Sequence, residues 1–340
     1  MPVRFLESQV DVAWARTLKW GVIGYGSQGH AHAQNLRDSG FEVTVALPES
    51  SRTRTLAESH GFAPVTTPEA VKYCDALKFC TADVPMADIY REEVAPHLRA
   101  GQALLFCHGF NVHYQRIVPP ADVDVVLVAP KGPGPGLRSQ YLAGSGLPAL
   151  VGVHQDATGR AQAIALAYAW GLGSFRAVVY ESSMRIETET DLFGEQAVLV
   201  GGVAHLVKAA FETLVEAGYP EEAAYFECMH ELKLVVDLLH EGGLSWMDYR
   251  VSDTAEWGGY VSGPRVVGPE SRRAMREILR EIQSGEFARE FIAENATGLP
   301  RMRAYRLADR THPVESIGRE VRADLAYLDD KLPPDNIKAT

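Results

Sequence analysis

KWGVIGYGSQGHAHAQNLRDSG, residues 19–40, begins as an apolar strand pattern and continues as a helical pattern that closes at a glycine. Gly24, Gly26 and Gly29 stand in G-x-G-x-x-G spacing at the point where the strand pattern gives way to the helix. Glycines alone are a weak signal, because Gly-rich turns are common. Their place between a strand and a helix makes them typical of a dinucleotide-binding turn, and a plain strand-to-helix turn is the less favoured alternative.

The three glycines have separate physical roles in such a turn. The first permits the tight turn, the second lets the backbone approach a pyrophosphate, and the third allows close packing of the helix. The phosphates then meet free N–H groups at the helix N-terminus. We therefore predict a dinucleotide site at this turn.

The remaining first half of the chain repeats the alternation of strand and helix. Nearly continuous apolar strands between helices indicate a parallel sheet covered on both faces. After about residue 182 the strand patterns stop, and helical periodicity of 3.6 residues takes over. We predict an α/β protein with an N-terminal doubly wound parallel sheet over 1–182, an all-helical domain over 183–328 and a tail over 329–340. The strands are expected at 19–24, 41–47, 76–80, 102–107, 123–129, 147–153 and 175–180, and the later helices at 196–218, 221–243 and 270–295.

Composition narrows the class of protein. The 340 residues can form two domains with separate cores, and the formal net charge of −11 argues against nucleic acid as a partner. We see no apolar stretch near the roughly 20 residues that cross a bilayer, and no signal peptide, so we expect no membrane. The cysteines show no C-x-x-C spacing, which predicts a reduced, cytoplasmic protein; they are Cys74, Cys80, Cys107 and Cys228.

Two pairs of carboxylates mark the helical half. Asp191 and Glu195 share a helix face at the head of an apolar run, and Glu227 and Glu231 repeat the spacing. Like charges four residues apart repel, and solvated surface is the ordinary explanation of such pairs. Four converging carboxylates would instead offer hard oxygen ligands to two divalent cations, for which Mg²⁺ is the best match. Spacing alone leaves both explanations open.

His108 and Lys131 each follow a predicted strand directly. The carboxyl ends of parallel strands are where ligands bind in open α/β sheets. Each residue alone is explained by a loop contact or a surface charge, but the two together favour a site at that edge. His30 and His32 would be splayed apart by a helix, so we do not predict them as ligands.

The end of the second strand should discriminate NAD from NADP, because an acid favours a free ribose and a base favours a 2′-phosphate. Glu49 favours the free 2′-hydroxyl. Ser51, Arg52 and Arg54 are able to hold a phosphate, so the residues of this loop conflict.

Seven motifs together resemble ketol-acid reductoisomerase (acetohydroxy-acid isomeroreductase) in its shorter form, over essentially the whole chain and in the right order. The resemblance implies a Rossmann domain, a knotted helical domain, and homodimers or higher oligomers whose helical domains complete each other's site; such a knot is an exception among folds. The motifs lie at residues 24–40, 107–111, 129–134, 187–196, 227–238, 252–258 and 312–322.

The resemblance also implies a reaction. An alkyl group migrates within 2-acetolactate or 2-aceto-2-hydroxybutyrate, and nicotinamide hydride reduces the product to a 2,3-dihydroxy acid in valine and isoleucine synthesis. Migration begins by deprotonating a tertiary alcohol, which two Mg²⁺ ions favour as Lewis acids. The hydride must come from NADH or NADPH, because no side chain supplies one.

The family match implies residue roles. Asp191 would bridge two Mg²⁺, Glu195 would bind one, and Glu227 and Glu231 the other, while Ser252 would bond the substrate. His108 and Lys131 would line the site between nicotinamide and metals, with Glu231 also catalytic. The implied cofactor contacts are Gly24, Tyr25, Gly26, Ser27, Gln28, Gly29, Glu49, Ser51, Arg52 and Gly134.

The chain departs from the family pattern at Pro48, where an Arg is common, and at Pro135, where a His is common. The first departure leads us to expect NADH or dual cofactor use. The alternatives to this family are a metal-independent β-hydroxyacid dehydrogenase, which would not need the carboxylate pairs, and a non-catalytic nucleotide sensor, which would leave His108 and Lys131 unexplained.

Overall fold

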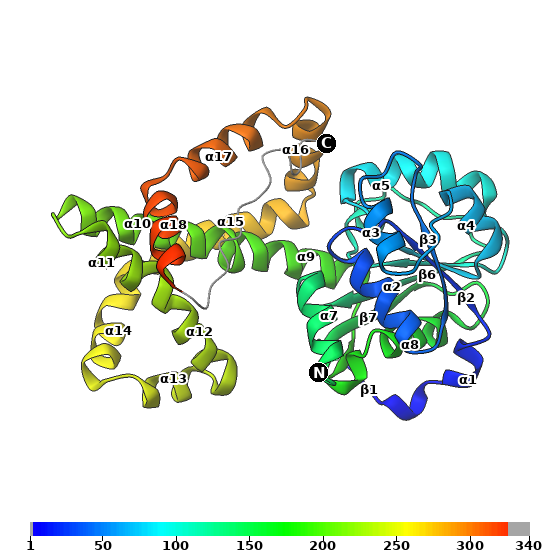
Figure 1. Ribbon diagram of the computed structural model, residues 1–340, viewed down its shortest axis with the longest axis horizontal. Helices are drawn as coiled ribbons and strands as arrows, with labels where there is room; N and C mark the ends of the chain where they lie inside the picture. The colour runs from blue at the N-terminus through cyan, green and yellow to red at the C-terminus, as the bar shows by residue number, and fades with distance from the viewer. Residues whose placement is uncertain (1–2, 326–340) are drawn as a thin grey trace. The chain divides into compact units, whose positions relative to one another are not determined.

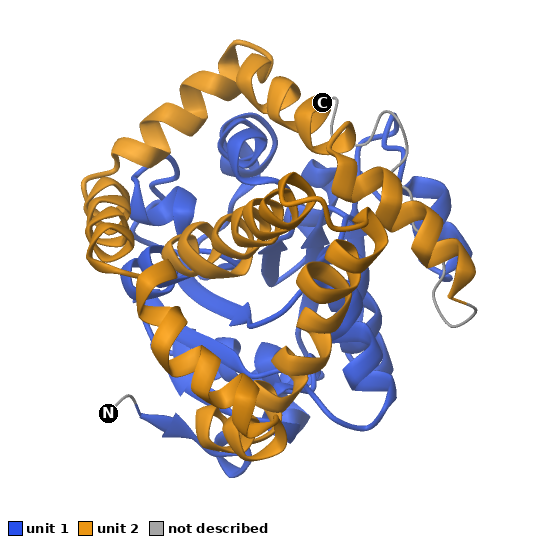
Figure 2. Ribbon diagram, turned by 90° about the vertical axis from the view of Figure 1, so that its left-hand side faces the viewer, with its two compact units in different colours: residues 1–191 blue, residues 192–340 orange. Residues whose placement is uncertain are grey.

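The computed structural model describes residues 3–325, so the predicted tail at 329–340 lies outside the described residues. Figure 1 shows the elements, and Figure 2 colours two compact units, residues 1–191 (unit 1) and 192–340 (unit 2). The sequence predicts the domain boundary near Ser182 and Ser183.

Unit 1 contains one eight-stranded sheet in the order β1-β8-β7-β6-β5-β4-β2-β3. The chain turns outward from β2 to β3 and then crosses back to β4, so the order reverses between β2 and β4. This crevice is where dinucleotides bind in doubly wound sheets. The strands are β1 Arg4–Phe5, β2 Lys19–Ile23, β3 Glu42–Ala46, β4 Ala76–Phe79, β5 Ala103–Phe106, β6 Asp124–Pro130, β7 Ala149–Gln155 and β8 Val179–Glu181.

The sheet is mostly parallel, which confirms the predicted doubly wound parallel sheet, and two of its pairings are antiparallel. β7 pairs antiparallel with β6, and β1 pairs antiparallel with β8. A strand buried on both faces has the same apolar pattern in either direction, so the pattern does not distinguish them. The strand predicted at 175–180 is also shorter, because Ser174–Arg176 forms a 3-10 turn before β8.

Successive residues of the central strands face opposite sides of the sheet and supply two cores. Leu105 of β5 packs with the α2 and α8 side, whereas Leu104 packs with the α4 and α5 side. This explains why the strands are apolar throughout. The helices of unit 1 are α1 Val12–Ala15, α2 Gly29–Asp38, α3 Arg54–Ser59, α4 Thr67–Tyr73, α5 Asp83–Ile89, α6 Phe110–His113, α7 Gly134–Leu142 and α8 Ala161–Gly171.

Unit 2 is helical throughout its described part, and α9 (Met184–Gly194) leads into it. Two π-helical turns interrupt the predicted helices, η5 at Glu195–Leu199 and η6 at Phe226–His230. The other helices are α10 Gly201–Glu216, α11 Glu221–Tyr225, α12 Glu231–Gly242, α13 Leu244–Arg250, α14 Asp253–Val266, α15 Pro269–Gln283, α16 Glu286–Ala296, α17 Pro300–Arg310 and α18 Pro313–Asp324.

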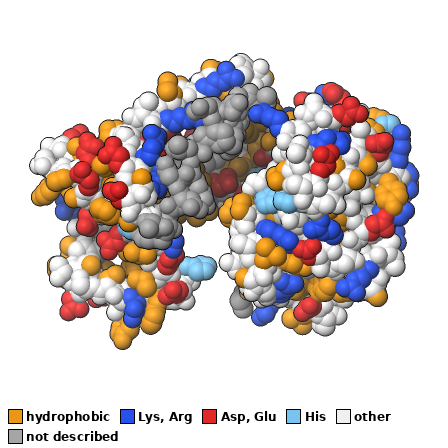
Figure 3. Space-filling view, viewed as in Figure 1, with side chains coloured by type: hydrophobic (Ala, Val, Ile, Leu, Met, Phe, Trp, Pro, Cys, Tyr) orange, Lys and Arg blue, Asp and Glu red, His pale blue; other side chains and the backbone are white. Residues whose placement is uncertain are grey.

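Unit 2 encloses little apolar surface of its own. Its core cluster joins α10 and α11 to α18 through six residues, and no residue of α12, α13, α14 or α17 is buried. Figure 1 shows α17 lying apart from α12, α13 and α14, and Figure 3 shows hydrophobic side chains exposed over α13 and α14. The core residues are Phe211, Ala224, Tyr225, Val314, Ile317 and Val321.

One helical stretch, Met184–Glu216, is long and apolar enough to cross a membrane by length and composition, although the sequence pattern predicts no such stretch. The 18-residue window responsible has a mean hydropathy of 1.6 and is 11% buried. Its Val, Leu and Ala residues raise the mean hydropathy although Gly and polar residues interrupt the run of large apolar side chains. One such helix is weak evidence, and its exposure is equally expected of a surface that packs on another protein.

Candidate active site

A four-residue cluster, the Glu187 cluster, lies within unit 1 and consists of His108, Lys131, Glu187 and Asp191. Glu187 Oε2 accepts hydrogen bonds from His108 Nδ1 at 2.9 Å and from Gly109 N at 3.0 Å. Lys131 Nζ donates to Glu187 Oε1 at 2.8 Å and to Asp191 Oδ1 at 2.9 Å. The structure thus brings the predicted His108, Lys131 and Asp191 together around an acid that we had not predicted.

The fold positions these residues through two strand ends and one helix. His108 follows β5, Lys131 follows β6, and these neighbouring strands are parallel, so both side chains emerge at one sheet edge. Helix α9 crosses this edge closely at Gly109, where a Cβ atom would lie 2.5 Å from the Met184 carbonyl oxygen. A larger residue at 109 would therefore push away the helix that carries the two acids.

Burial and charge shift the pKa values of the cluster. Burial opposes the charged form of His108, but the bond and charge of Glu187, with Asp83 and Asp191, raise its pKa from 6.5 to about 9. Burial likewise disfavours ionised Glu187, yet His108 and Lys131 outweigh it and lower its pKa from 4.5 to about 2. The cluster is therefore an ion-pair network at neutral pH.

Glu187 could have been found from the sequence. It stands four residues before Asp191, so both acids share a face of one helix, as Asp191 and Glu195 were argued to do. The same spacing of four residues separates Glu187 from Asp191 and Asp191 from Glu195. The sequence does not show which residues Glu187 contacts, because its partners His108 and Lys131 lie 79 and 56 residues away in the chain.

The predicted glycine turn has the geometry that a bound pyrophosphate requires. Gly24 has a φ of +98°, which favours glycine, and a Cβ atom at Gly29 would lie 2.2 Å from the Gly24 carbonyl oxygen. A Cβ atom at Gly26 would meet no heavy atom within 4 Å, so the turn is open at its middle glycine. Tight turn, open centre and close helix packing match the three roles expected of the glycines.

A second loop packs on this turn. A Cβ atom at Gly134 would lie 1.4 Å from the Ser27 carbonyl oxygen, and Gln28 Nε2 donates to the Gly132 carbonyl oxygen at 3.0 Å. The side chain of Tyr25 points elsewhere: it is 2% exposed, and its hydroxyl shares a hydrogen bond with His60 Nδ1 at 2.9 Å. Any cofactor contact at residue 25 therefore involves the backbone.

The loop after β3 presents Glu49 and Arg52 to solvent. Ser51 Oγ lies 3.0 Å from Thr53 Oγ1, so these two hydroxyls bond each other. Arg54 turns back, because its Nη1 donates to the Pro64 carbonyl oxygen at 3.1 Å. One of the two arginines that might have held a 2′-phosphate is thus engaged by the fold.

The other predicted site residues lie in unit 2. Glu195, Glu227 and Glu231 are exposed, and Ser252 caps α14 by accepting from Ala255 N at 3.2 Å. Glu195 is the first residue of the π turn η5, and Glu227 lies inside the π turn η6. Glu231 is the first residue of α12, which directly follows η6. Such turns re-aim side chains and are frequent at functional sites. Within residues 3–325, neither group of three clustered metal-ligand side chains includes Glu227 or Glu231.

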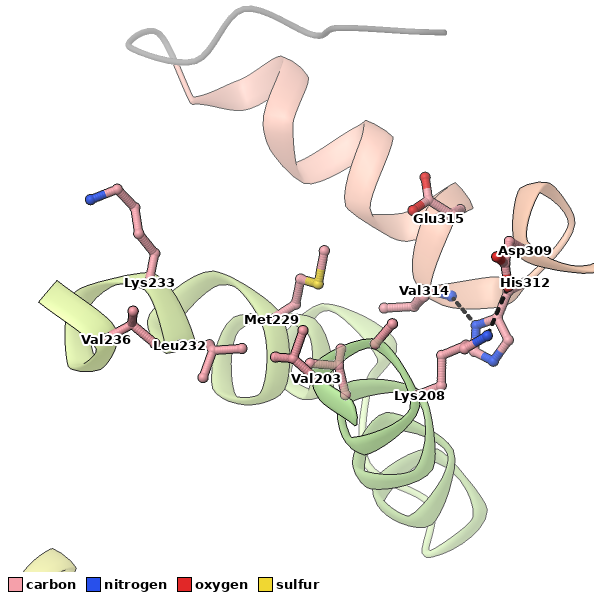
Figure 4. Close-up of a pocket in the computed structure, with 12 residues that line it drawn as sticks. Val203, Lys208, Met229, Leu232, Lys233, Val236, Asp309, His312, Val314 and Glu315 are labelled. Carbon is pink, nitrogen blue, oxygen red and sulfur yellow. Dashed lines mark hydrogen bonds and ion pairs between the residues drawn. The ribbon is translucent and has the colours of Figure 1, made fainter. Parts of the chain in front are cut away.

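An apolar cavity of about 440 Å³ also lies in unit 2, where α10 and α12 meet the turn between α17 and α18 (Figure 4). Met229, Leu232 and Val203 gather between the helices, and Lys208 Nζ bonds Asp309 Oδ1 at 2.7 Å at one end. Its lining contains no predicted site residue, so it is an uncovered apolar surface rather than a catalytic pocket.

Comparison with known families explains this combination. Residues 16–178 match the family described as acetohydroxy acid isomeroreductase, NADPH-binding domain, and residues 184–326 match ketol-acid reductoisomerase, C-terminal domain. The chain belongs to the ketol-acid reductoisomerase family. As a member, it is an NAD(P)H-dependent isomeroreductase of branched-chain amino-acid biosynthesis, and its two halves are the Rossmann-like and all-helical domains of that family.

Solved structures agree with this assignment. An NADH-preferring ketol-acid reductoisomerase from an uncultured archaean is 41% identical with a TM-score of 0.92, over 94% of this chain and 98% of that chain. A semialdehyde dehydrogenase NAD-binding protein from Cupriavidus necator, 19% identical, has a TM-score of 0.60 over 78% of this chain and 99% of its own. The second likeness concerns the fold alone.

Proposed function

We propose that this ketol-acid reductoisomerase converts 2-acetolactate and 2-aceto-2-hydroxybutyrate with two Mg²⁺ ions per site, uses NADH at least as well as NADPH, and acts as a cytoplasmic homodimer. The observation that carries the proposal is the Glu187 cluster, which holds a proton-bearing imidazole, a fixed ammonium group and a carboxylate at the sheet edge where a nicotinamide would lie.

The four proposed metal ligands suit Mg²⁺ chemically. All are carboxylates, the hard oxygen donors that this ion prefers. Glu227 and Glu231 are exposed and form no hydrogen bond or ion pair with another described residue, so their oxygens are available. When bound at Asp191, Glu195, Glu227 and Glu231, the ions supply Lewis-acid stabilisation of negative charge on substrate oxygens.

Residues of unit 1 perform the proton and positioning chemistry. Glu187 holds Nδ1–H of His108, which fixes the orientation of the ring and leaves Nε2 to exchange a proton with a substrate oxygen. Lys131 fixes the Asp191 carboxylate through its 2.9 Å bond and places a positive charge beside the reacting group. The nicotinamide supplies the hydride.

The loop after β3 supports NADH or dual use. Pro48 has no N–H to offer a phosphate, Glu49 is exposed where it accepts a bond from a ribose hydroxyl, and Arg54 is engaged by Pro64. A lost charge-assisted bond to phosphate is worth about 1.5–3 kcal/mol. The NADH preference of the archaean relative agrees with this proposal.

The exposed helices support a homodimer. The six-residue core of unit 2 and the uncovered cavity of about 440 Å³ leave extended apolar surface, which commonly marks an interface with another protein. A second copy is the simplest partner, since most oligomers are homo-oligomers with a two-fold axis.

One assay tests these assignments together. NADH and NADPH oxidation is followed with saturating 2-acetolactate, with Mg²⁺ and after its removal by a chelator. We expect turnover that requires Mg²⁺ and a kcat/KM for NADH at least equal to that for NADPH. Preference for NADPH above about tenfold would show that Ser51 and Arg52 outweigh Glu49. Turnover without any divalent ion would refute the metal assignment.

A further inference from the structure

Cys80 and Cys107 lie side by side beneath the glycine turn. They directly follow β4 and β5, whose last residues, Phe79 and Phe106, are register partners. Their Sγ atoms are 3.6 Å apart. Neighbouring strands are about 4.8 Å apart, and disulfides form across Cα distances of about 4.4–6.8 Å, so the backbone can accept a bond between these sulfurs.

The pair lies at the crevice between β2 and β4. Cys80 N donates to the Ile23 carbonyl oxygen at 2.8 Å, and the Cys80 carbonyl oxygen lies 2.9 Å from where a Cβ atom of Gly24 would be. On the other side, Cys80 Cβ lies 3.3 Å from the Cβ position of Gly29. Movement of Cys80 therefore displaces the first and third glycines of the dinucleotide turn.

Buried polar groups surround Cys107. His32 Nε2 lies 4.0 Å from its Sγ atom, and His32 Nδ1 shares a hydrogen bond with the Tyr168 hydroxyl at 3.0 Å. Lys78 is fully buried on the same side of β4 as Cys80, and its Nζ donates to the Val128 carbonyl oxygen at 2.6 Å. A hydrogen bond from Cys80, followed by the charges of Lys78 and His32, lowers the pKa of the Cys107 thiol although burial opposes this.

We propose that Cys80 and Cys107 form a reversible disulfide under oxidation by a peroxide, and that this bond weakens dinucleotide binding at the glycine turn. The effect on binding rests on the proposed cofactor site, whereas the disulfide itself does not. A metal bound by His32, Cys80 and Cys107 is the alternative occupant, and the test below distinguishes it from the disulfide.

The chemistry balances in two steps. The Cys107 thiolate attacks hydrogen peroxide, so an S–O bond forms, the O–O bond breaks and hydroxide leaves, which gives a sulfenic acid. The Cys80 sulfur then attacks Cys107, so the S–S bond forms, the S–O bond breaks and a second hydroxide leaves. The thiol protons convert both hydroxides to water, and the two thiols lose two electrons to the peroxide. A dithiol reductant reverses the change.

Bond formation must move the sulfurs, because the present separation of 3.6 Å shortens to a bond of about 2.05 Å. The glycine turn lies against Cys80 without space for an added methyl group. We therefore expect oxidation to weaken NADH binding by about fivefold or more, the lower range of usual coupling between sites. Bound NADH should in turn disfavour the disulfide at equilibrium by the same factor.

The test uses the full-length protein with hydrogen peroxide as oxidant and NADH as ligand. Binding of NADH by the reduced protein is measured first. If the reduced protein does not bind NADH, the proposed function is refuted, whereas the proposed disulfide is not. Free thiols should then fall from the four of the reduced chain to two, and a non-reducing peptide map should join Cys80 to Cys107. Dithiothreitol should restore both the thiols and NADH affinity.

Variants separate the pair from the other thiols. Cys80→Ser and Cys107→Ser should each retain NADH binding and lose its peroxide sensitivity, while Cys228→Ser, in unit 2, should remain as sensitive as the parent. Four thiols persisting after peroxide, a different disulfide, or stoichiometric Zn²⁺ held by the reduced pair would each overturn the proposal. Disulfide formation with unchanged NADH affinity would overturn its regulatory part.

Discussion

Glu187 joins the imidazole of His108, the backbone N–H of Gly109 and the ammonium of Lys131 through two oxygens that are almost fully buried. Glu187→Gln keeps the shape but removes the charge that raises the pKa of His108. We expect the pKa of His108 in Mg²⁺-free protein to fall from about 9 toward 6.5, as measured by NMR titration. The kcat should fall about tenfold or more, as for loss of a positioned proton carrier.

The same contact makes stability depend on pH in metal-free protein. His108 has a raised pKa, so its contribution is complete below pH 6.5 and is lost as pH rises through about 9. Glu187 has a lowered pKa, so its contribution is present above pH 4.5 and is lost as pH falls through about 2. Urea unfolding should show the gap in stability between the parent and Glu187→Gln shrinking as pH rises from 6.5 to 9. A gap that is constant across this range would contradict the ion pair.

Asp191 and Glu195 test the metal assignment at the residue scale. Asp191→Asn or Glu195→Gln should abolish turnover and leave NADH affinity nearly unchanged, because the proposed metal and the dinucleotide are held by different residues. Glu216→Gln, an equal charge change at an exposed position of α10, should leave turnover unchanged and serves as the control. Normal activity of either ligand variant at ordinary Mg²⁺ concentration would remove both residues from the metal site.

At the scale of elements, the packing of α7 leaves less space for a side chain at Gly134 than at Gly136. A Cβ atom at Gly134 collides with backbone, 1.4 Å from the Ser27 carbonyl oxygen, whereas one at Gly136 meets its nearest heavy atom, in Pro133, at 3.6 Å. Gly134→Ala should therefore cost about 1–3 kcal/mol and displace the glycine turn. We expect a lower Tm and weaker NADH binding, with both near normal in Gly136→Ala. Equal effects of the two variants would show that the turn tolerates displacement.

Elements were predictable where short-range patterns determine them. The strand, glycine turn and helix of 19–40 could be predicted because the three glycines and the apolar patterns on either side of them lie within one short stretch of sequence. The antiparallel direction of β7 could not, since its pairing with β6 leaves no mark in an apolar run. The π turns at Glu195 and Phe226 were also missed, because one extra residue hardly changes a 3.6-residue period.

The candidate site divides in the same way. His108 and Lys131 were predictable as the residues that end neighbouring strands, but Glu187 and the contact between Cys80 and Cys107 depend on segments brought together by the sheet. The metal ligands in unit 2, Ser252 and the knot stay predictions from family resemblance. Contacts among distant segments are therefore where sequence patterns stop being informative.

At the scale of the whole molecule, unit 2 does not bury its own helices. No residue of α12, α13, α14 or α17 is buried, although Trp246, Trp257 and Tyr260 are among their exposed side chains. Aromatic residues are enriched at the centres of interfaces. The helices that carry Glu231 and follow Ser252 therefore leave apolar and aromatic side chains exposed, which supports the proposed homodimer.

Shared sites can be tested by mixing inactive subunits. Glu227→Gln should inactivate the enzyme by a change in unit 2, and Lys131→Ala by a change in unit 1. If each site combines unit 1 of one chain with unit 2 of the other, a mixed dimer contains one site that carries neither substitution. Random exchange makes about half of the dimers mixed, and one intact site in each restores about a quarter of the parent activity. Activity is measured after exchange has been verified with differently tagged chains, and each variant incubated alone is the control. Complete exchange without recovered activity would place all catalytic residues of a site within one chain, and the exposed helices of unit 2 would then need a partner other than a second active subunit.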